Sequence, residues 1–210
     1  MPMKRKYRSL NPLEETSTAM VVRAFLAFPL APQCLWDVGS GTGKVLIESA
    51  LRYRNTKLIG FEKNPDYLPI SQENMERHGI EEGRIEVHLL DMCHDDVSAF
   101  QRPDAIYLSC AGSAEEDIIP KLWDILLPGG VIVCNVGQQG KNPAIPEWTR
   151  RVQGAHKRFG GKLEDYTQWY DITHVSRYRN PLGKAWAVED ALHWEGRKPV
   201  EEATAVAGLV

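Results

Sequence analysis

The segment Asp37–Lys44, with the sequence DVGSGTGK, constrains the fold of this 210-residue chain more than any other stretch. It follows a short apolar run, residues 34–38, and precedes a run with helical spacing, residues 44–53. Glycine adopts positive φ angles and lets another group approach the backbone closely. Three glycines between a strand and a helix therefore predict a ligand-binding turn at the start of an α/β fold.

The rest of the chain repeats this alternation of strand and helix. Strands joined by helices of about ten residues predict a doubly wound, mostly parallel sheet that is covered on both faces. The alternation weakens after residue 137, where we expect an antiparallel edge near the C-terminus. Pro69 predicts a kink or a late start in its helix. The expected helices are 12–28, 44–53, 64–78, 115–127 and 147–158, and the expected strands are 34–38, 57–62, 84–90, 104–109, 131–136, 168–173 and 184–192.

Composition fits one globular domain. Apolar residues make up 43% of the chain and charged residues 25%, which excludes disorder and membrane bundles and suffices for one core. The longest apolar stretch, residues 19–32, is broken by Arg23 and Pro29, so we expect neither a membrane anchor nor a signal peptide. Four widely spaced cysteines form no zinc-type cluster, which predicts a reduced, cytoplasmic protein without a metal.

The ligand class of the turn follows from its spacing. A P-loop needs glycine at position 38 and serine or threonine at position 45, but both positions are valine. A dinucleotide fingerprint needs its third glycine at position 44, which is lysine. The observed spacing is G-x-G-x-G.

This spacing, behind an acid at position 37, resembles motif I of the class I S-adenosylmethionine (SAM) methyltransferases. The resemblance covers residues 34–136 and implies a Rossmann-like fold with SAM as the cofactor. It implies that Asp37 contacts the amino group of SAM, that Glu62 accepts the ribose hydroxyls and that Asp91 accepts the adenine amino group. All three acids end a predicted strand, so they meet at the edge where open α/β sheets bind ligands. The cofactor-binding residues so assigned are Asp37, Gly39, Ser40, Gly41, Gly43, Glu62, Lys63, Asp91 and Met92.

The methyl acceptor is indicated by two further stretches. Residues 104–113 lack the Asn/Asp-Pro-Pro-Tyr/Phe motif of base-methylating enzymes, which argues against a nucleic-acid substrate. Their small-residue turn, together with Val175–Pro181 (VSRYRNP), resembles the precorrin methyltransferases of the cobalamin pathway, which methylate and decarboxylate a tetrapyrrole. The resemblance favours a small-molecule substrate.

Two other function classes remain open. Gly60–Pro65 (GFEKNP) is similar to lysine methyltransferases outside the SET class, and the segment 104–106 with the turn at 128–130 is similar to isoaspartyl methyltransferases. A protein acceptor is therefore the alternative, and a SAM-binding module without turnover is a further one. The oligomeric state is left open.

The net charge of −3 conceals a division along the chain. Residues 9–140 hold 10 basic and 19 acidic groups, whereas residues 141–200 hold 11 basic and 7 acidic groups. The basic part would suit an anionic substrate. We expect one domain, 1–210, with a basic arm and helix (1–33), a SAM-binding core (34–136), a basic substrate-side region (137–200) and a tail (201–210). The basic residues considered for the substrate are Arg150, Arg151, Lys157, Arg158, Arg177 and Arg179.

The acceptor is expected at the carboxyl ends of the strands 104–109 and 131–136. No catalytic residue is assigned. The positions expected nearest the acceptor are Ser109, Cys110, Ala111 and Asn135. The candidate polar groups are His94, Asp95, Asp96, Tyr107, His174 and Tyr178, and the hydroxyls of residues 16–18 are candidates for the SAM carboxylate.

Overall fold

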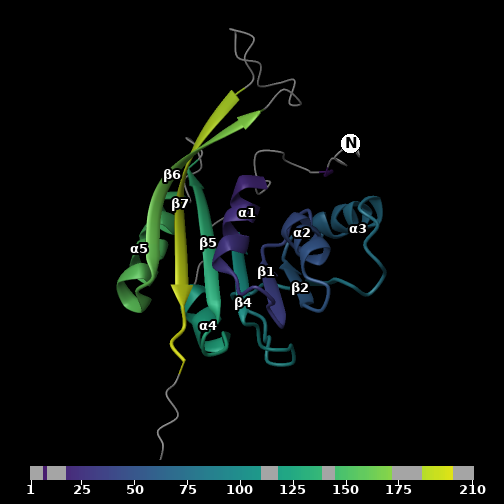
Figure 1. Cartoon of the computed structure of the whole chain (residues 1–210), viewed down its shortest axis with the longest axis horizontal. Helices are drawn as coiled ribbons and strands as arrows, with labels where there is room; N and C mark the ends of the chain where they lie inside the picture. Colours follow the sequence, from purple (N-terminus) through teal and green to yellow (C-terminus); the bar gives the residue numbers. More distant parts are fainter. Residues whose placement is uncertain (1–6, 9–17, 110–117, 139–144, 172–185, 201–210) are drawn as a thin grey trace, which may run out of the picture.

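A computed structural model describes residues 7–8, 18–109, 118–138, 145–171 and 186–200 of the chain (Figure 1). The helices are α1 (Thr18–Ala27), α2 (Lys44–Arg52), α3 (Tyr67–Arg77), α4 (Ile118–Ile125) and α5 (Ile145–Phe159). The strands are β1 (Cys34–Val38), β2 (Lys57–Glu62), β3 (Glu86–Leu89), β4 (Ala105–Ser109), β5 (Val131–Gln138), β6 (Lys162–Asp171) and β7 (Trp186–Arg197).

The seven strands form one sheet in the order β3-β2-β1-β4-β5-β7-β6. Strands β1 to β5 are parallel, and β7 pairs antiparallel with both β5 and β6. This confirms the predicted α/β fold with a mostly parallel sheet and an antiparallel C-terminal edge. The strand order reverses between β1 and β4, and ligands of open α/β sheets bind at the carboxyl ends of the strands at such a point.

Helices cover both faces of the sheet, because side chains along each strand alternate between faces. On one face Val21 of α1 and Leu46 of α2 pack in the same cluster as Leu35 of β1. On the other face Ile119 of α4 and Val152 of α5 share a cluster with Trp36. Figure 1 shows α1 and α2 on the opposite side of the sheet from α5.

Two local details of the prediction are resolved by the structure. Helix α3 begins at Tyr67, so Pro69 lies in its first turn, where a missing N–H breaks no helical hydrogen bond. The late start is therefore the correct alternative. Strand β6 begins at Lys162, directly after two glycines with positive φ, and therefore earlier than the predicted strand 168–173. Strand β7 runs to Arg197 and therefore ends later than the predicted strand 184–192.

Two basic side chains hold the end of α4. Lys198 Nζ donates to the carbonyl oxygens of Trp123 (3.0 Å) and Leu126 (2.9 Å), and Arg102 Nε donates to that of Ile125 (2.7 Å). They satisfy carbonyls that have no partner within the helix, and their positive charge suits its C-terminal dipole.

Within the described ranges, none of the helices combines the length and apolar content that a bilayer crossing requires.

Candidate functional site

The glycine-rich turn joins β1 to α2 with three residues in the left-handed region. Gly39, Gly41 and Gly43 have φ angles of 77°, 48° and 76°. The N–H groups of Gly39 and Ser40 donate to the Phe61 carbonyl at 2.9 and 3.1 Å, so the turn is attached to the end of β2. Side chains with a Cβ are strained at such angles, which explains the three glycines.

Asp37 lies at the carboxyl end of β1 and is 1% exposed. Within the described part of the chain, neither of its carboxylate oxygens has a hydrogen-bond partner. Burial, followed by the negative charge of Glu62, raises the pKa of Asp37 well above its usual value. A buried carboxylate of this kind is unfavourable unless a cation or a hydrogen-bond donor joins it.

Glu62 ends β2 and ties the turn to the next loop. Its Oε2 accepts from the N–H of Gly41 and its Oε1 from the N–H of Asn64, both at 2.8 Å. Each oxygen keeps further acceptor capacity, which two neighbouring hydroxyls could use. Lys63, the next residue, is exposed.

Asp91 and Met92 lie in the turn that follows β3. Asp91 is half-buried and its Oδ1 accepts from the N–H of Cys93 at 3.0 Å. The side chain of Met92 packs in the core, so only its backbone is available to a ligand. Lys121 of α4 holds this turn, since its Nζ donates to the carbonyls of Met92 (2.7 Å) and Asp95 (2.8 Å).

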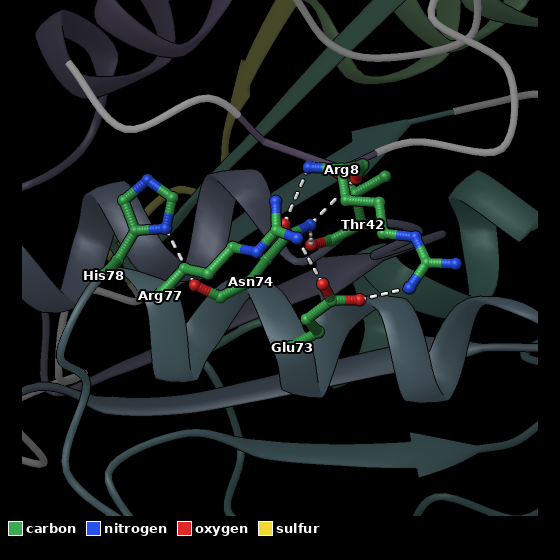
Figure 2. Close-up of polar contacts among 6 residues, drawn as sticks. All are labelled: Arg8, Thr42, Glu73, Asn74, Arg77 and His78. Atoms are coloured by element: carbon green, nitrogen blue, oxygen red, sulfur yellow. Dashed lines mark hydrogen bonds and ion pairs between the residues drawn. The ribbon is translucent and has the colours of Figure 1, made fainter.

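Helix α3 packs directly behind the glycine turn. A Cβ at Gly43 would lie 2.5 Å from the Oγ of Ser71, so a side chain there would have to displace that hydroxyl. Asn74 Nδ2 donates to the Thr42 carbonyl at 3.0 Å (Figure 2). Sequence reasoning missed Ser71 and Asn74, because a polar residue inside an amphipathic helix carries no local signal that it is buried.

The other polar candidates are placed as follows. Tyr107 is buried in the core of the α1 and α2 face. His94, Asp95 and Asp96 are exposed in the turn after β3, where Asp95 Oδ2 accepts from the Asp91 N–H at 2.8 Å. Hydrogen bonds from the backbone and hydroxyl of Ser98 lower the pKa of Asp96. Asp91, Asp95 and Asp96 each accept a hydrogen bond from a backbone N–H and so stabilise this turn.

The predicted acceptor side is described in part. Ser109 and Asn135 are Cα partners at the carboxyl ends of β4 and β5, so the backbone places them together. The predicted residues outside the described ranges are Thr16, Ser17, Cys110, Ala111, His174, Arg177, Tyr178 and Arg179.

The basic residues of α5 do not all lie at this edge. Helix α5 follows β5 and returns toward its amino end, because β6 begins at Lys162, whose partner Glu195 pairs with Val133. Lys157 and Arg158 are in the last turn of α5 and therefore lie toward the opposite edge of the sheet. The structure does not favour a role for these two residues in binding a substrate at the carboxyl edge, whereas Arg150 and Arg151 lie nearer the middle of the helix.

The described residues offer neither a metal site nor, at Cys34 and Cys134, a reactive thiol. In the ranges that the structure describes, no three His, Cys, Asp or Glu side chains gather as a metal site. Burial raises the pKa of the Cys34 thiol to about 11, and Cys34 and Cys134 are both buried free thiols. Such thiols are poor nucleophiles at neutral pH.

The polar groups of the turn fit SAM. Asp37 lacks a partner, and so do the buried hydroxyls of Ser40 and Ser71, among the described residues. An ammonium group would supply donors to Asp37, and the nearby Glu62 adds negative charge that favours a cationic ligand. The chemistry of these side chains suits a positively charged molecule that carries hydroxyl groups.

Comparison with known proteins agrees with this chemistry. Residues 14–180 match the family model described as the precorrin methyltransferase domain. The cobalt-precorrin-6B C(15)-methyltransferase (decarboxylating) of Salmonella typhimurium is 30% identical over 99 residues, which are 47% of this chain and 49% of that protein. The match thus spans about half the length of this curated relative.

Solved structures share the fold. The precorrin-6y C5,15-methyltransferase of Geobacter metallireducens has a TM-score of 0.67 at 16% identity and covers 92% of this chain and 94% of its own. An RNA methyltransferase of Salinibacter ruber, solved in complex with S-adenosyl-L-homocysteine, has a TM-score of 0.55 at 18% identity, with coverage of 88% and 94%. At these identities the likeness shows the fold alone.

Proposed function

Because this chain belongs to the precorrin methyltransferase domain family, we propose that it transfers a methyl group from SAM to a precorrin-type tetrapyrrole. The family match bears out the resemblance seen in the sequence, and members of this methyltransferase family use SAM. The observation that carries the proposal is the buried, unpartnered carboxylate of Asp37 beside a turn of three positive-φ glycines.

We assign the cofactor contacts to residues at three strand ends. Asp37 binds the ammonium group of SAM, and Glu62 accepts hydrogen bonds from the ribose hydroxyls with oxygens that already hold the turn. Asp91 and the N–H of Met92 bind the adenine ring. The backbone of Gly39–Gly43 supports the methionine part, because glycine permits close approach.

In the proposed methyl transfer, SAM and the protein chain have different roles. SAM, when bound, supplies an electrophilic methyl group, and the acceptor carbon supplies the electron pair of the new bond, while the pair of the broken S–C bond stays on sulfur. The chain aligns the two reactants, which lowers the entropic part of the barrier. The acceptor would approach at the carboxyl ends of β4 and β5, beside Ser109 and Asn135.

The proposal predicts SAM binding that depends on Asp37. By isothermal titration calorimetry we expect Asp37→Asn to weaken SAM binding about 100-fold or more, because the variant loses a charge-assisted contact in a buried site. The matched control is Asp66→Asn. Asp66 is exposed at the start of α3, so this variant should bind SAM with the affinity of wild type. Equal affinity for wild type and Asp37→Asn would contradict the site.

The substrate is tested in the same preparation. Wild-type protein with methyl-labelled SAM is given either a cobalt-precorrin or a cell extract divided into protein and small-molecule fractions. Label in the tetrapyrrole, absent with Asp37→Asn, supports the proposal. Label recovered only in protein would reject the tetrapyrrole acceptor and leave the SAM site standing.

A further inference from the structure

We propose that Asn74 is a positioning residue for the SAM-binding turn and that it makes the segment Tyr7–Arg8 a part of the cofactor site. Asn74 lies in α3 and touches both the N-terminal segment and the turn (Figure 2). The inference rests on the proposed function, because the turn is taken to bind SAM.

The Asn74 side chain is fully buried and its amide group is occupied on both sides. Its Oδ1 accepts from the Arg8 N–H at 2.7 Å, and its Nδ2 donates to the Arg8 carbonyl at 2.9 Å. The same Nδ2 donates to the Thr42 carbonyl at 3.0 Å. One side chain therefore links two backbone segments that are far apart in sequence, and the link does not depend on the side chain of Arg8.

The Thr42 carbonyl belongs to the part of the turn that the cofactor must approach. Thr42 lies between Gly41, whose N–H donates to Glu62, and Gly43, whose N–H donates to the Ser40 carbonyl at 2.8 Å. Glycine places few steric limits on its own dihedral angles, so this part of the turn depends on hydrogen bonds to hold its peptide groups. The bond from Asn74 to the Thr42 carbonyl holds the same peptide group whose N–H, that of Gly43, donates to Ser40, and the two bonds together fix its direction.

Tyr7 attaches the same segment to both neighbouring helices. Its hydroxyl donates to Glu48 Oε1 of α2 at 2.9 Å, and its ring stacks on His78 at 4.4 Å between centroids. Lys44, the first residue of α2, has its Nζ 5.2 Å from the Tyr7 ring centroid. The segment thus contacts α2, which starts from the glycine turn, and α3, which follows the Glu62 loop.

An exposed ion pair adds little to this docking. The guanidinium group of Arg8 pairs with Glu73, and both side chains are substantially exposed. Exposed ion pairs contribute weakly because water screens them. The contacts that matter are therefore the buried ones of Asn74 and the ring contacts of Tyr7, and by linkage SAM binding and docking of the segment favour each other.

The test compares SAM affinity and thermal stability in four full-length variants, one deletion, and the combination of that deletion with Asn74→Ala. We expect Asn74→Ala, and separately deletion of residues 1–8, to weaken SAM binding about tenfold at a temperature where each protein is folded. The combination should be little weaker than either alone, because both changes remove the same link. The controls are Gln72→Ala, an exposed residue of α3, and Glu73→Ala, which removes the ion pairs of Glu73 with Arg8 and Arg77, and both should bind SAM within twofold of wild type. Asn74→Asp, which keeps an acceptor for the Arg8 N–H but loses the donor to the carbonyls of Thr42 and Arg8, should resemble Asn74→Ala.

The outcomes separate the alternatives. A lower melting temperature with unchanged SAM affinity in Asn74→Ala would show a purely structural role and overturn the inference. If that variant does not fold, the deletion decides, because it retains Asn74, and normal SAM affinity there overturns the inference equally. In wild type, SAM should slow hydrogen–deuterium exchange in the peptide that contains Arg8, and no slowing contradicts the coupling. Absence of SAM binding by wild type would instead reject the proposed function itself.

Discussion

At the scale of single residues, Asp37 opposes the stability of the unliganded fold. Its carboxylate is buried beside Glu62 and, among the described residues, has no hydrogen-bond partner. Burial without a donor disfavours the charged form, which is why its pKa is raised. The carboxylate that we propose to bind the ammonium group of SAM thus destabilises the protein when SAM is absent.

This gives a prediction for Asp37→Asn without SAM. A raised pKa means that the folded protein still binds a proton where the unfolded chain has lost it, so wild-type stability falls as pH rises from about the usual value of 3.8 toward the raised pKa. The amide has no charge, so we expect the variant to be more stable than wild type at neutral pH by about 1–3 kcal/mol. Thermal denaturation from about pH 4 to about pH 8 measures the difference, which should grow with pH. A variant less stable than wild type at about pH 8 would contradict this.

Some of these residues could be predicted from the sequence and others could not. Asp37 and Glu62 stand where apolar strands end, and parallel strands bring their carboxyl ends to one edge, so their proximity follows from the pattern. Asn74 contacts residues 32 and 66 positions away. Nothing local in the sequence marks such a contact, because it depends on how α3 packs against the turn.

At the scale of elements, α4 supports the turn after β3 from one side. Lys121 donates from α4 to two carbonyls of that turn, whereas Lys198 donates to carbonyls at the C-terminal end of α4 itself. The two lysines make similar bonds to backbone carbonyls in different places. Replacing Lys198 therefore tests the stability of α4, and replacing Lys121 tests the support of the turn.

We expect Lys121→Met and Lys198→Met each to lower the free energy of unfolding by about 1–2 kcal/mol, since each leaves carbonyls without a charged donor. Only Lys121→Met should also weaken SAM binding, by about three- to tenfold, because the turn that carries Asp91 loses its support. Urea denaturation and calorimetry measure the two effects. Equal SAM affinity in both variants would show that Lys121 acts on stability alone.

The hairpin of β6 and β7 shows the limit of element prediction. Its two ends near the glycines carry charged residues, among them Lys162, Glu195 and Arg197. An edge hairpin tolerates such residues, so the apolar pattern that marks a buried strand is missing there. The predicted strands 168–173 and 184–192 therefore leave out residues 162–167 of β6 and 193–197 of β7.

At the scale of the whole molecule, Trp194 joins β7 to the helix layer of α4 and α5. It is fully buried, and its Nε1 donates to the Gly160 carbonyl at 3.0 Å. A Cβ at Gly196 would lie 2.3 Å from its Cζ2, so the strand itself makes room for the ring. Arg197 Nη2 donates to the Ala27 carbonyl of α1 at 2.6 Å, which links β7 to α1.

We therefore expect Trp194→Phe to lower the free energy of unfolding by about 1–3 kcal/mol, because it leaves the Gly160 carbonyl unpaired and the ring site underfilled. Trp123→Phe is the control, since Trp123 is partly exposed and a phenylalanine ring at this position can still stack on Phe159. It should cost less than about 1 kcal/mol. Urea denaturation measures both, and SAM affinity should be unchanged in both. A cost of Trp194→Phe no larger than that of the control would contradict the role of this hydrogen bond.

The strand order was predicted only in outline. Alternating strands and helices predict a parallel sheet with an antiparallel edge, as observed. That β7 inserts between β5 and β6 could not be predicted, because either strand of a hairpin can pair with the sheet. Pairing is decided by contacts such as those of Trp194 and not by the periodicity of the strands.

The position of β7 also affects the order in which the chain can fold while it is being synthesised. The outer edge of β5 is covered by β7, which follows the other described strands in the chain, so that edge stays open until the ribosome has released residues beyond Arg197. Open strand edges pair readily with other chains. The nascent chain therefore carries a complete glycine turn and an exposed strand edge together during that interval.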